Sequence, residues 1–316
     1  MKQNEKYFES HDGAKLHLYT WSPNTQPKAV LHIAHGMAEH ALRYKVLAEK
    51  LTAAGIEVWA ADQRGHGKTA DLSKNDAGKG GILGHCADSD TFALIVQDIR
   101  ALVTEIQKTR KNIPVFVFGH SWGSFLTQKF IEDHSQSLDI RGCILSGTRG
   151  SGGLQVLAGI PFMTKLAFFL GARKTSVLAK NIADGSYNKP FKPNRTEFDW
   201  LSRDEKEVDK YIQDPFCGFL CSVGFYRDLA KGLFSIHRKK NIAKIKQTLP
   251  LYIFCGSADP VGEMGKSPAA LVQAYRRHGI QDLEFVVYPD ARHETLNETN
   301  RQEVMANLLA WMQKHI

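Results

Sequence analysis

Short apolar runs alternate with longer amphipathic stretches along most of the chain. The apolar runs predict strands at residues 16–21, 29–34, 57–61, 115–118, 142–145, 251–255 and 283–288. Apolar residues at helical spacing predict helices at residues 43–54, 91–109, 269–278 and 300–316. Strands and helices that alternate in this order predict an α/β fold, with a mostly parallel sheet and helices on both of its faces.

The alternation stops between about residues 148 and 223. Residues 151–170 are rich in Leu, Ile, Met and Phe, but Pro161 and Lys165 interrupt the run. Spanning a bilayer takes about 20 apolar residues, so this run is too short to do so. We therefore expect a cap, residues 148–223, inserted above the carboxyl edge of the sheet. Residues 1–147 and 224–316 would form the core.

A candidate nucleophile follows the apolar run at residues 114–118. The run leads directly into Gly119-His120-Ser121-Trp122-Gly123, and residues 123–132 have helical spacing. A serine hydroxyl is a poor nucleophile unless the backbone presents it and a base deprotonates it. The G-x-S-x-G turn between a strand and a helix presents serine in this way. The pattern therefore predicts Ser121 as a catalytic nucleophile.

Ser121 needs a base and an orienting acid, which an α/β sheet supplies from loops at the carboxyl ends of its strands. His293 follows the last predicted strand, and Asp259 follows the strand at residues 251–255. Asp290 lies only three residues before His293, too close in a tight loop to orient it well. The order Ser121, Asp259, His293 is the one typical of α/β-hydrolases, so we predict these three residues as the catalytic triad.

An oxyanion hole requires two backbone N–H groups that face the developing negative charge. One is expected from Trp122, the residue after the nucleophile. The other is expected from Met37 in the loop at residues 35–40, because Gly36 lets the chain turn and present the next N–H. The two histidines of this loop are poorly placed as a metal pair, so we expect a structural role for both and a salt bridge through Glu39.

Together these motifs resemble the monoacylglycerol lipase and lysophospholipase group of α/β-hydrolases. The resemblance rests on residues 35–40, 62–67, 119–123, 256–259 and 292–293, in that order. It covers nearly the whole chain outside the cap. It implies an eight-stranded sheet, a helical cap over a lipophilic pocket, and a serine hydrolase mechanism that uses neither a metal nor a cofactor.

The segment at residues 62–67 and the residue after the nucleophile each carry a specific expectation. We interpret the segment Asp62-Gln63-Arg64-Gly65-His66-Gly67 as a structural turn. In it, Asp62 and Arg64 are expected to satisfy buried backbone groups of the loop. Trp122 departs from the group, which usually has methionine at this position. The bulkier indole could narrow the acyl channel.

The cap offers apolar side chains for an acyl chain. Because each buried methylene contributes about 0.8 kcal/mol, such a lining favours acyl esters over peptides. We predict a serine hydrolase that cleaves carboxylic esters of lipid-like substrates, monoacylglycerol or lysophospholipid, through an acyl-enzyme on Ser121. The residues expected to line the substrate site are Leu154, Leu157, Ile160, Phe162, Met163 and Leu166.

Three alternatives stay open. A proline-type aminopeptidase on the same fold would need acidic groups for a free α-amine, which Asp184, Glu197 and Asp199 of the cap could supply. A short-chain carboxylesterase would lose rate steeply as the acyl chain lengthens. A non-catalytic ligand-binding member of the fold is disfavoured, because all three triad positions are filled.

Composition adds few constraints. The 316 residues, 43% of them hydrophobic and 23% charged, suit one large α/β domain with an insertion. The five cysteines form no disulfide or zinc pattern, and the polar residues 1–13 do not resemble a secretory signal, so we expect a cytoplasmic protein. The net charge of +8 is dispersed, which argues against nucleic acid as a partner but suits a peripheral contact of the cap with a membrane.

Overall fold

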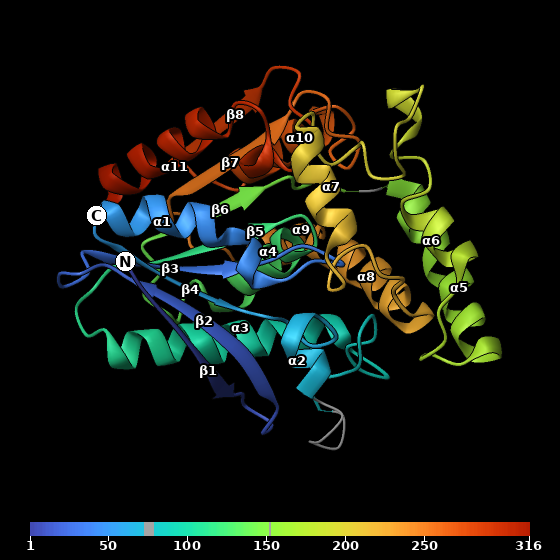
Figure 1. The fold of residues 1–316 in the computed structure, drawn as a ribbon, viewed down its shortest axis with the longest axis horizontal. Helices are drawn as coiled ribbons and strands as arrows, with labels where there is room; N and C mark the ends of the chain where they lie inside the picture. The colour runs from blue at the N-terminus through green and yellow to red at the C-terminus, as the bar shows by residue number, and fades with distance from the viewer. Residues whose placement is uncertain (73–78, 152) are drawn as a thin grey trace.

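An eight-stranded sheet with helices on both faces forms the centre of the molecule (Figure 1). The computed structural model describes residues 1–72, 79–151 and 153–316, and the side chains of residues 71, 72 and 153–156 lie outside the description. The strands are β1 (Lys2–Glu9), β2 (Lys15–Ser22), β3 (Ala29–Ala34), β4 (Ile56–Ala61), β5 (Val115–His120), β6 (Gly142–Ser146), β7 (Leu251–Gly256) and β8 (Leu283–Tyr288).

The strand order across the sheet is β1-β2-β4-β3-β5-β6-β7-β8. Strand β2 pairs antiparallel with both β1 and β4, and every other neighbouring pair is parallel. The predicted fold, a mostly parallel eight-stranded sheet of the α/β-hydrolase type, is confirmed.

Helices connect the parallel strands and extend beyond the carboxyl edge of the sheet. They are α1 (Lys45–Ala53), α2 (Gly67–Leu72), α3 (Thr91–Thr109), α4 (Trp122–His134), α5 (Gly153–Leu170), α6 (Val177–Ala183), α7 (Glu205–Gln213), α8 (Val223–Ile236), α9 (Lys239–Ile242), α10 (Lys266–Arg277) and α11 (Arg301–His315). Three short 3₁₀ helices are described as well: η1 (Ala41–Tyr44), η2 (Lys189–Phe191) and η3 (Thr295–Asn297).

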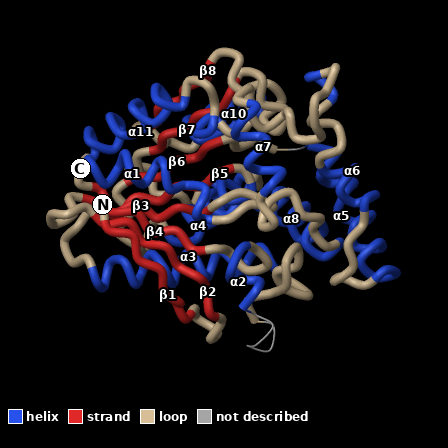
Figure 2. The backbone as a smooth tube through the Cα atoms, in the orientation of Figure 1, coloured by secondary structure: helices blue, strands red, loops and turns tan. Residues whose placement is uncertain are grey.

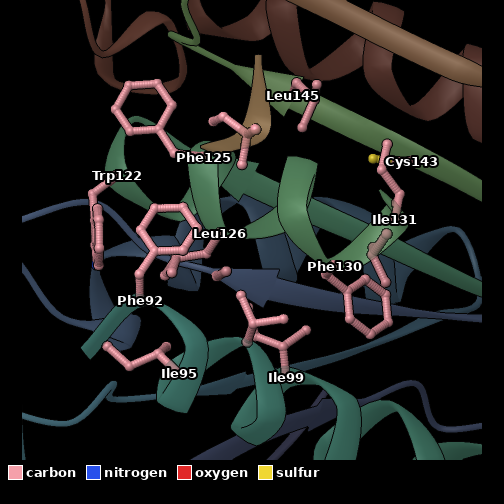
Figure 3. Close-up of a cluster of buried hydrophobic side chains, with 14 of the residues drawn as sticks. Phe92, Ile95, Ile99, Trp122, Phe125, Leu126, Phe130, Ile131, Cys143 and Leu145 are labelled. Carbon is pink, nitrogen blue, oxygen red and sulfur yellow. The ribbon is translucent and has the colours of Figure 1, made fainter. Parts of the chain in front are cut away.

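The two faces of the sheet carry separate apolar cores. Because successive side chains of a strand point to opposite faces, β5 contributes to both of them. Val115 and Val117 pack with residues of α3 and α4, a region that Figure 3 shows in close-up. Phe116 and Phe118 pack with residues of α1 and α11 on the other face. Burial on both faces explains why the central strands are continuous apolar runs in the sequence.

Helices rather than strands fill the chain between β6 and β7. Within the described residues the sheet gains no strand there, and the segment contributes only an isolated bridge between Thr175 and Ser222. Helices α5 and α6 lie at the end of the molecule away from both termini (Figure 2). Helix α8, which begins at Val223, contacts α5 as well as the core helices α3 and α4. The cap boundaries at residues 148 and 223 stay a prediction.

No helix in the described parts of the chain combines the length and the apolar character that crossing a bilayer requires.

Candidate active site

Ser121 occupies a strained turn between β5 and α4. Its backbone has φ 50° and ψ −120°, a region that residues other than glycine rarely adopt. Its N–H donates to the carbonyl oxygen of Ser146, 2.9 Å away at the end of β6. A Cβ atom at Gly123 would collide with the carbonyl oxygen of Ala34, and one at Gly119 would collide with the carbonyl oxygen of Gly123. The close approach of β3, β5 and α4 therefore explains both glycines of the motif.

His293 and Asp259 meet beside this turn. Nδ1 of His293 lies 3.0 Å from Oδ1 of Asp259, and both side chains are buried. The same Oδ1 accepts the N–H of Val261 at 2.9 Å, which holds the carboxylate in place. Asp290, the competing acid, lies exposed in the turn after β8 with φ 57°. The structure thus brings Asp259 to His293 across 34 residues of sequence.

The other imidazole nitrogen of His293 is free to act on Ser121. Nε2 is buried and has no hydrogen-bond partner among the described residues, Ser121 included. Catalytic hydrogen bonds are often long in a free enzyme and shorten when the substrate binds. Ser121 and His293 line the same cavity, so the arrangement provides a nucleophile, a base and an orienting acid.

Two histidines lie side by side in the site but differ in their proton affinity. Burial disfavours the charged form of His293, but the carboxylate of Asp259 outweighs it and raises the pKa of His293 above 6.5. The ring of His120 lies 4.8 Å from that of His293, between ring centroids, and burial lowers the pKa of His120 to about 4. His293 is therefore the histidine of this pair that can accept a proton near neutral pH.

Two backbone N–H groups are available beside Ser121. Within the described chain, neither the N–H of Met37 nor that of Trp122 has a hydrogen-bond acceptor, and both residues line the cavity. Gly36 donates its own N–H to Oε1 of Glu39 at 2.5 Å, and Ala38 adopts φ 52°. These local constraints fix the loop that carries Met37.

The side chain of Trp122 is fixed in the core. Its Nε1–H donates to Oε1 of Gln63 at 3.0 Å, and its ring packs against the rings of Phe92 and Phe225. Only 1% of the residue is exposed. Trp122 is nevertheless one of the residues that line the cavity, and the narrowing of an acyl channel by the indole stays a prediction.

A buried ion bridge links the Met37 loop to the segment of His293. Arg43 contacts Oε2 of Glu39 at 2.7 Å and both carboxylate oxygens of Glu294 at 2.6 and 2.7 Å. Burial opposes the ionised form of both carboxylates, but Arg43 outweighs it and lowers the pKa of each. The sequence predicts a salt bridge of Glu39, whereas Glu294 lies 251 residues from Arg43, where no local spacing indicates it.

Residues 62–67 have the structural role expected of them. Oδ1 of Asp62 accepts the N–H of Ala41 at 2.8 Å, and its Oδ2 accepts the N–H of Lys68 at 2.8 Å. The guanidinium of Arg64 contacts Asp98 and Asp12. His35, from the Met37 loop, accepts the N–H of Gln63 through its Nε2 at 2.9 Å.

A cavity of about 80 Å³ opens above Ser121. Apart from the triad and oxyanion residues, its wall is mostly apolar or aromatic, with four charged side chains: Glu39, Lys180, Asp184 and Glu294. The apolar and aromatic wall residues outside the oxyanion hole are Ala38, Phe125, Ala183, Tyr187, Phe198, Trp200, Leu201, Tyr211, Phe219, Tyr226, Leu229 and Val261.

The predicted acyl-site residues of α5 are not in this wall. Leu157 and Phe162 are exposed, by 46% and 43%, and Met163 is buried away from the cavity. Ile160 and Leu166 are partly buried and also lie outside the wall, and the side chain of Leu154 is outside the description. Because α5 packs on α8 while α6 and α8 border the cavity, the prediction for α5 is not supported by this structure.

The three acidic cap residues considered for binding an α-amine have different surroundings. Asp184 lines the cavity with its Oδ1 3.6 Å from Nζ of Lys180. The side chain of Glu197 is 70% exposed. Asp199 is buried and accepts the backbone N–H groups of Arg195 and Thr196.

The raised pKa of His293 predicts an acid limit to activity. The free enzyme needs a neutral imidazole, so kcat/KM on a soluble ester should fall as pH drops through a midpoint above 6.5. Glu294→Gln removes a negative charge that raises the pKa of His293, so the midpoint of this variant should move to lower pH. The measurement is a pH profile of kcat/KM, with the exposed Glu284→Gln as control. A midpoint that stays in place or rises in Glu294→Gln would contradict the assignment.

Comparison with known proteins gives the family from the sequence and the same fold from solved structures. Residues 25–300 match the Hydrolase_4 family model, described as serine aminopeptidase, S33. The chain is 27% identical to a monoacylglycerol lipase of Mycolicibacterium smegmatis over 317 residues, which cover 99% of this chain and 98% of the relative.

Two solved structures resemble it over their whole length. A thermostable carboxyl esterase from Bacillus coagulans, solved with glycerol, has a TM-score of 0.88 and 26% identity, with 100% of this chain and 99% of the esterase covered. A soluble variant of the monoglyceride lipase from Saccharomyces cerevisiae has a TM-score of 0.72 at 21% identity, with 100% and 95% covered, and shares the fold. With its serine turn, buried His–Asp pair and mostly parallel sheet, the chain belongs to the serine aminopeptidase S33 (Hydrolase_4) family of α/β-hydrolases.

Proposed function

We propose that this protein is a serine hydrolase that cleaves carboxylic esters of lipid-like substrates, monoacylglycerols first among them, through an acyl-enzyme on Ser121. The observation that carries the proposal is the strained turn of Ser121 beside the buried His293–Asp259 pair, at the base of a mostly apolar cavity. The similarity to a mycobacterial monoacylglycerol lipase over 99% of the chain supports the substrate class.

The reaction proceeds in two steps. Oγ of Ser121 attacks the ester carbonyl while Nε2 of His293 takes its proton, and Asp259 holds the imidazole and stabilises the imidazolium. The N–H groups of Met37 and Trp122 bind the oxyanion. His293 then gives the proton to the leaving alcohol, and a water molecule activated by the same histidine hydrolyses the acyl-enzyme.

The cavity favours an ester over an aminopeptidase substrate. A free α-amine needs a carboxylate that is not already neutralised. Each acidic residue in the cavity wall contacts a cationic side chain: Glu39 and Glu294 share Arg43, and Asp184 lies beside Lys180. The aromatic and aliphatic wall suits an acyl chain instead.

A panel of acyl esters tests the proposal. We expect kcat/KM for 1-monoacylglycerols to rise with acyl length, because each further buried methylene adds about 0.8 kcal/mol, or up to about fourfold, to binding in the transition state. The panel also contains lysophospholipids of matched chain length and aminoacyl amides, and Ser121→Ala serves as the blank. A steep fall in rate beyond short chains would favour a short-chain carboxylesterase, and turnover that requires a free amine would favour an aminopeptidase.

We also propose that the cap contacts lipid surfaces peripherally. Helices α5 and α6 expose Phe168 and Phe169, by 82% and 79%, and Val177 and Leu178, by 63% and 54%. Helices α5 and α6 themselves lie at the end of the molecule away from both termini (Figure 1). A group of exposed apolar side chains of this kind is typical of a surface that docks on a partner or a membrane.

Removing the two exposed phenylalanines should weaken this contact. The double variant Phe168→Ser and Phe169→Ser should sediment at least several-fold less with phosphatidylcholine vesicles that contain monoacylglycerol, because insertion of apolar area drives interfacial binding. Turnover of a soluble short-chain ester should change little, because neither residue lines the cavity. Tyr7→Ser is the control, since Tyr7 is 55% exposed on β1 at the opposite edge of the sheet from β8. Equal loss of vesicle binding in both variants would contradict the proposal.

A further inference from the structure

Three side chains with metal-ligand chemistry meet at the seam between the cap and the Met37 loop. They are His40 from that loop, and Asp214 and Cys217 from the turn that follows α7. One ligand atom of each lies within 4.8 Å of the others. Sequence spacing indicates no such cluster, because His40 is far in sequence from the other two.

We propose that His40, Asp214 and Cys217 bind a thiophilic divalent cation, Zn²⁺ by preference, and that the bound ion inhibits the enzyme reversibly by cross-linking the cap to the loop of the oxyanion hole. The donors are an imidazole nitrogen, a carboxylate oxygen and a sulfur, a set that zinc accepts. Three protein ligands leave a fourth tetrahedral position for water. The site is separate from the triad, and the inference goes beyond the proposed function.

The present geometry needs only small shifts to hold the ion, with His40 and Asp214 moving slightly apart and the thiol moving closer. Zinc–ligand distances of about 2.0–2.3 Å in a tetrahedron place the ligand atoms about 3.4–3.6 Å apart. Nε2 of His40 now lies 2.9 Å from Oδ2 of Asp214, so the ion would replace the proton between them. The thiol must close from at most 4.8 Å. Its proton leaves to solvent when the thiolate binds.

The turn that carries two of the ligands is already organised. Oδ1 of Asp214 accepts the N–H of Phe216 at 2.8 Å, and the N–H of Cys217 donates to the carbonyl oxygen of Asp214 at 3.0 Å. Oδ2 of Asp214 is thereby directed away from its own turn, toward His40. The side chain of Asp214 is 32% exposed, which gives an ion access from solvent, whereas His40 and Cys217 are buried.

Charged groups near the cluster have opposite effects on the binding of a cation. Burial raises the pKa of the Cys217 thiol, and the guanidinium of Arg43 acts in the opposite direction. That guanidinium would also repel a cation, but Glu39 and Glu294 bind it at 2.6–2.7 Å. The carboxylate of Asp214 and the thiolate of Cys217 would together supply two negative charges, which neutralise the divalent ion that they bind.

Binding at this seam would disturb the oxyanion hole. The carbonyl oxygen of Ala38 accepts the N–H of Gly218 at 3.0 Å and the hydroxyl of Tyr211 at 2.8 Å, so hydrogen bonds already join the cap turn to the loop. Ala38, at φ 52°, lies between Met37 and the ligand His40. Rearrangement of His40 around the ion would therefore shift the N–H of Met37, which needs a fixed position to stabilise the oxyanion.

Cobalt and zinc titrations of the chelator-treated full chain test the inference. Co²⁺ should bind one ion per chain and give the near-ultraviolet absorption of a cobalt–thiolate bond. Zn²⁺ should displace it and slow both ester turnover and labelling of Ser121 by a fluorophosphonate, and a chelator should restore both. The absorption should be lost in Cys217→Ser and in Asp214→Asn. Half-inhibition of these two variants should require at least tenfold more Zn²⁺ than half-inhibition of the parent chain.

Cys221→Ser is the matched control, because Cys221 is a buried cysteine on the same cap segment outside the cluster. It should keep the cobalt–thiolate absorption and the zinc sensitivity. Absence of the absorption in the parent chain, its persistence in Cys217→Ser, or its loss in Cys221→Ser would each overturn the site. Binding without any effect on turnover or labelling would overturn the inhibition. Asp214→Asn keeps every thiol, so it tests the site even if Cys217→Ser does not fold.

Discussion

Ser121→Ala should reduce the turnover of acyl esters by about 10⁴- to 10⁶-fold, the range found when a serine nucleophile that acts with its histidine is removed. The reason is that Ser121, in its strained turn, lines the cavity beside His293, and no acyl-enzyme can form without its hydroxyl. Steady-state kinetics on the best ester of the panel measures the loss. The variant should also fail to react with a fluorophosphonate. Folding is checked by circular dichroism and thermal unfolding.

Two further variants distinguish a triad from a lone reactive serine. Asp259→Asn should cost about 10⁴-fold in kcat, because the amide no longer selects the imidazole tautomer that presents a free Nε2 to Ser121. Ser137→Ala, at an exposed serine after α4, should keep full activity. If Asp259→Asn retained more than a tenth of the activity, the role given to the His293–Asp259 contact would be wrong.

The sequence predicted those features that follow from local periodicity and chain order. The central strands β3 to β7 are buried on both faces, so they appear as continuous apolar runs. The edge strand β1 was not predicted, because nearly all of its residues are exposed and polar and no apolar run marks it. Its position depends on pairing with β2, which is a tertiary contact.

The sequence could not predict which residues form the wall of the cavity above Ser121. Residues 153–170 are apolar around the whole helix, so their composition predicts burial without saying which face meets the cavity. The structure places α5 on the outer side of α8, and the wall comes from α6, α8 and the loops near Tyr187 and Trp200. Trp200 carried no signal of its own, although its carbonyl oxygen accepts the N–H of His293 at 3.3 Å.

Long-range ion pairs are the other feature without a sequence signal. A charged residue in a sequence is by default a solvated one. A salt bridge of Glu39 was expected, but nothing in the local context of Arg43 or Glu294 marks either residue as part of it. Their importance arises from burial, which removes water as the alternative partner. Arg43→Met therefore tests whether this buried bridge supports the active-site loops.

We expect Arg43→Met to lower the free energy of unfolding by about 3–5 kcal/mol, because it leaves two buried carboxylates without a cation. Methionine conserves much of the apolar stem, so the lost charge dominates the effect. Urea unfolding with linear extrapolation measures it. Arg195→Met is the control, since its ion pair with Asp209 is exposed on both sides and should contribute little.

The pH dependence separates lost charge from lost packing. In the parent chain burial opposes ionisation of Glu39 and Glu294, but Arg43 outweighs it and lowers the pKa of both below 4.5. Their contribution is therefore present above pH 4.5 and is lost as pH falls through the lowered values. Without Arg43, burial becomes the largest influence on both carboxylates and should raise their pKa values, so the variant gains stability relative to the parent as the carboxylates protonate. The difference in the free energy of unfolding between the parent and Arg43→Met should therefore become smaller toward acidic pH.

Removing the charges of Glu39 and Glu294, which have no cation in Arg43→Met, should restore stability at neutral pH. Adding Glu39→Gln and Glu294→Gln to Arg43→Met leaves neutral groups that can still hydrogen-bond, so most of the lost free energy should return. Activity should not return with it, because Arg43, which joins Glu39 of the Met37 loop to Glu294 beside His293, is still absent. A destabilisation that is independent of pH and unchanged in the triple variant would show that Arg43 acts through packing, for instance on the ring of Tyr211 at 4.9 Å. Recovery of stability without activity would place the bridge in the alignment of the oxyanion loop with the catalytic histidine.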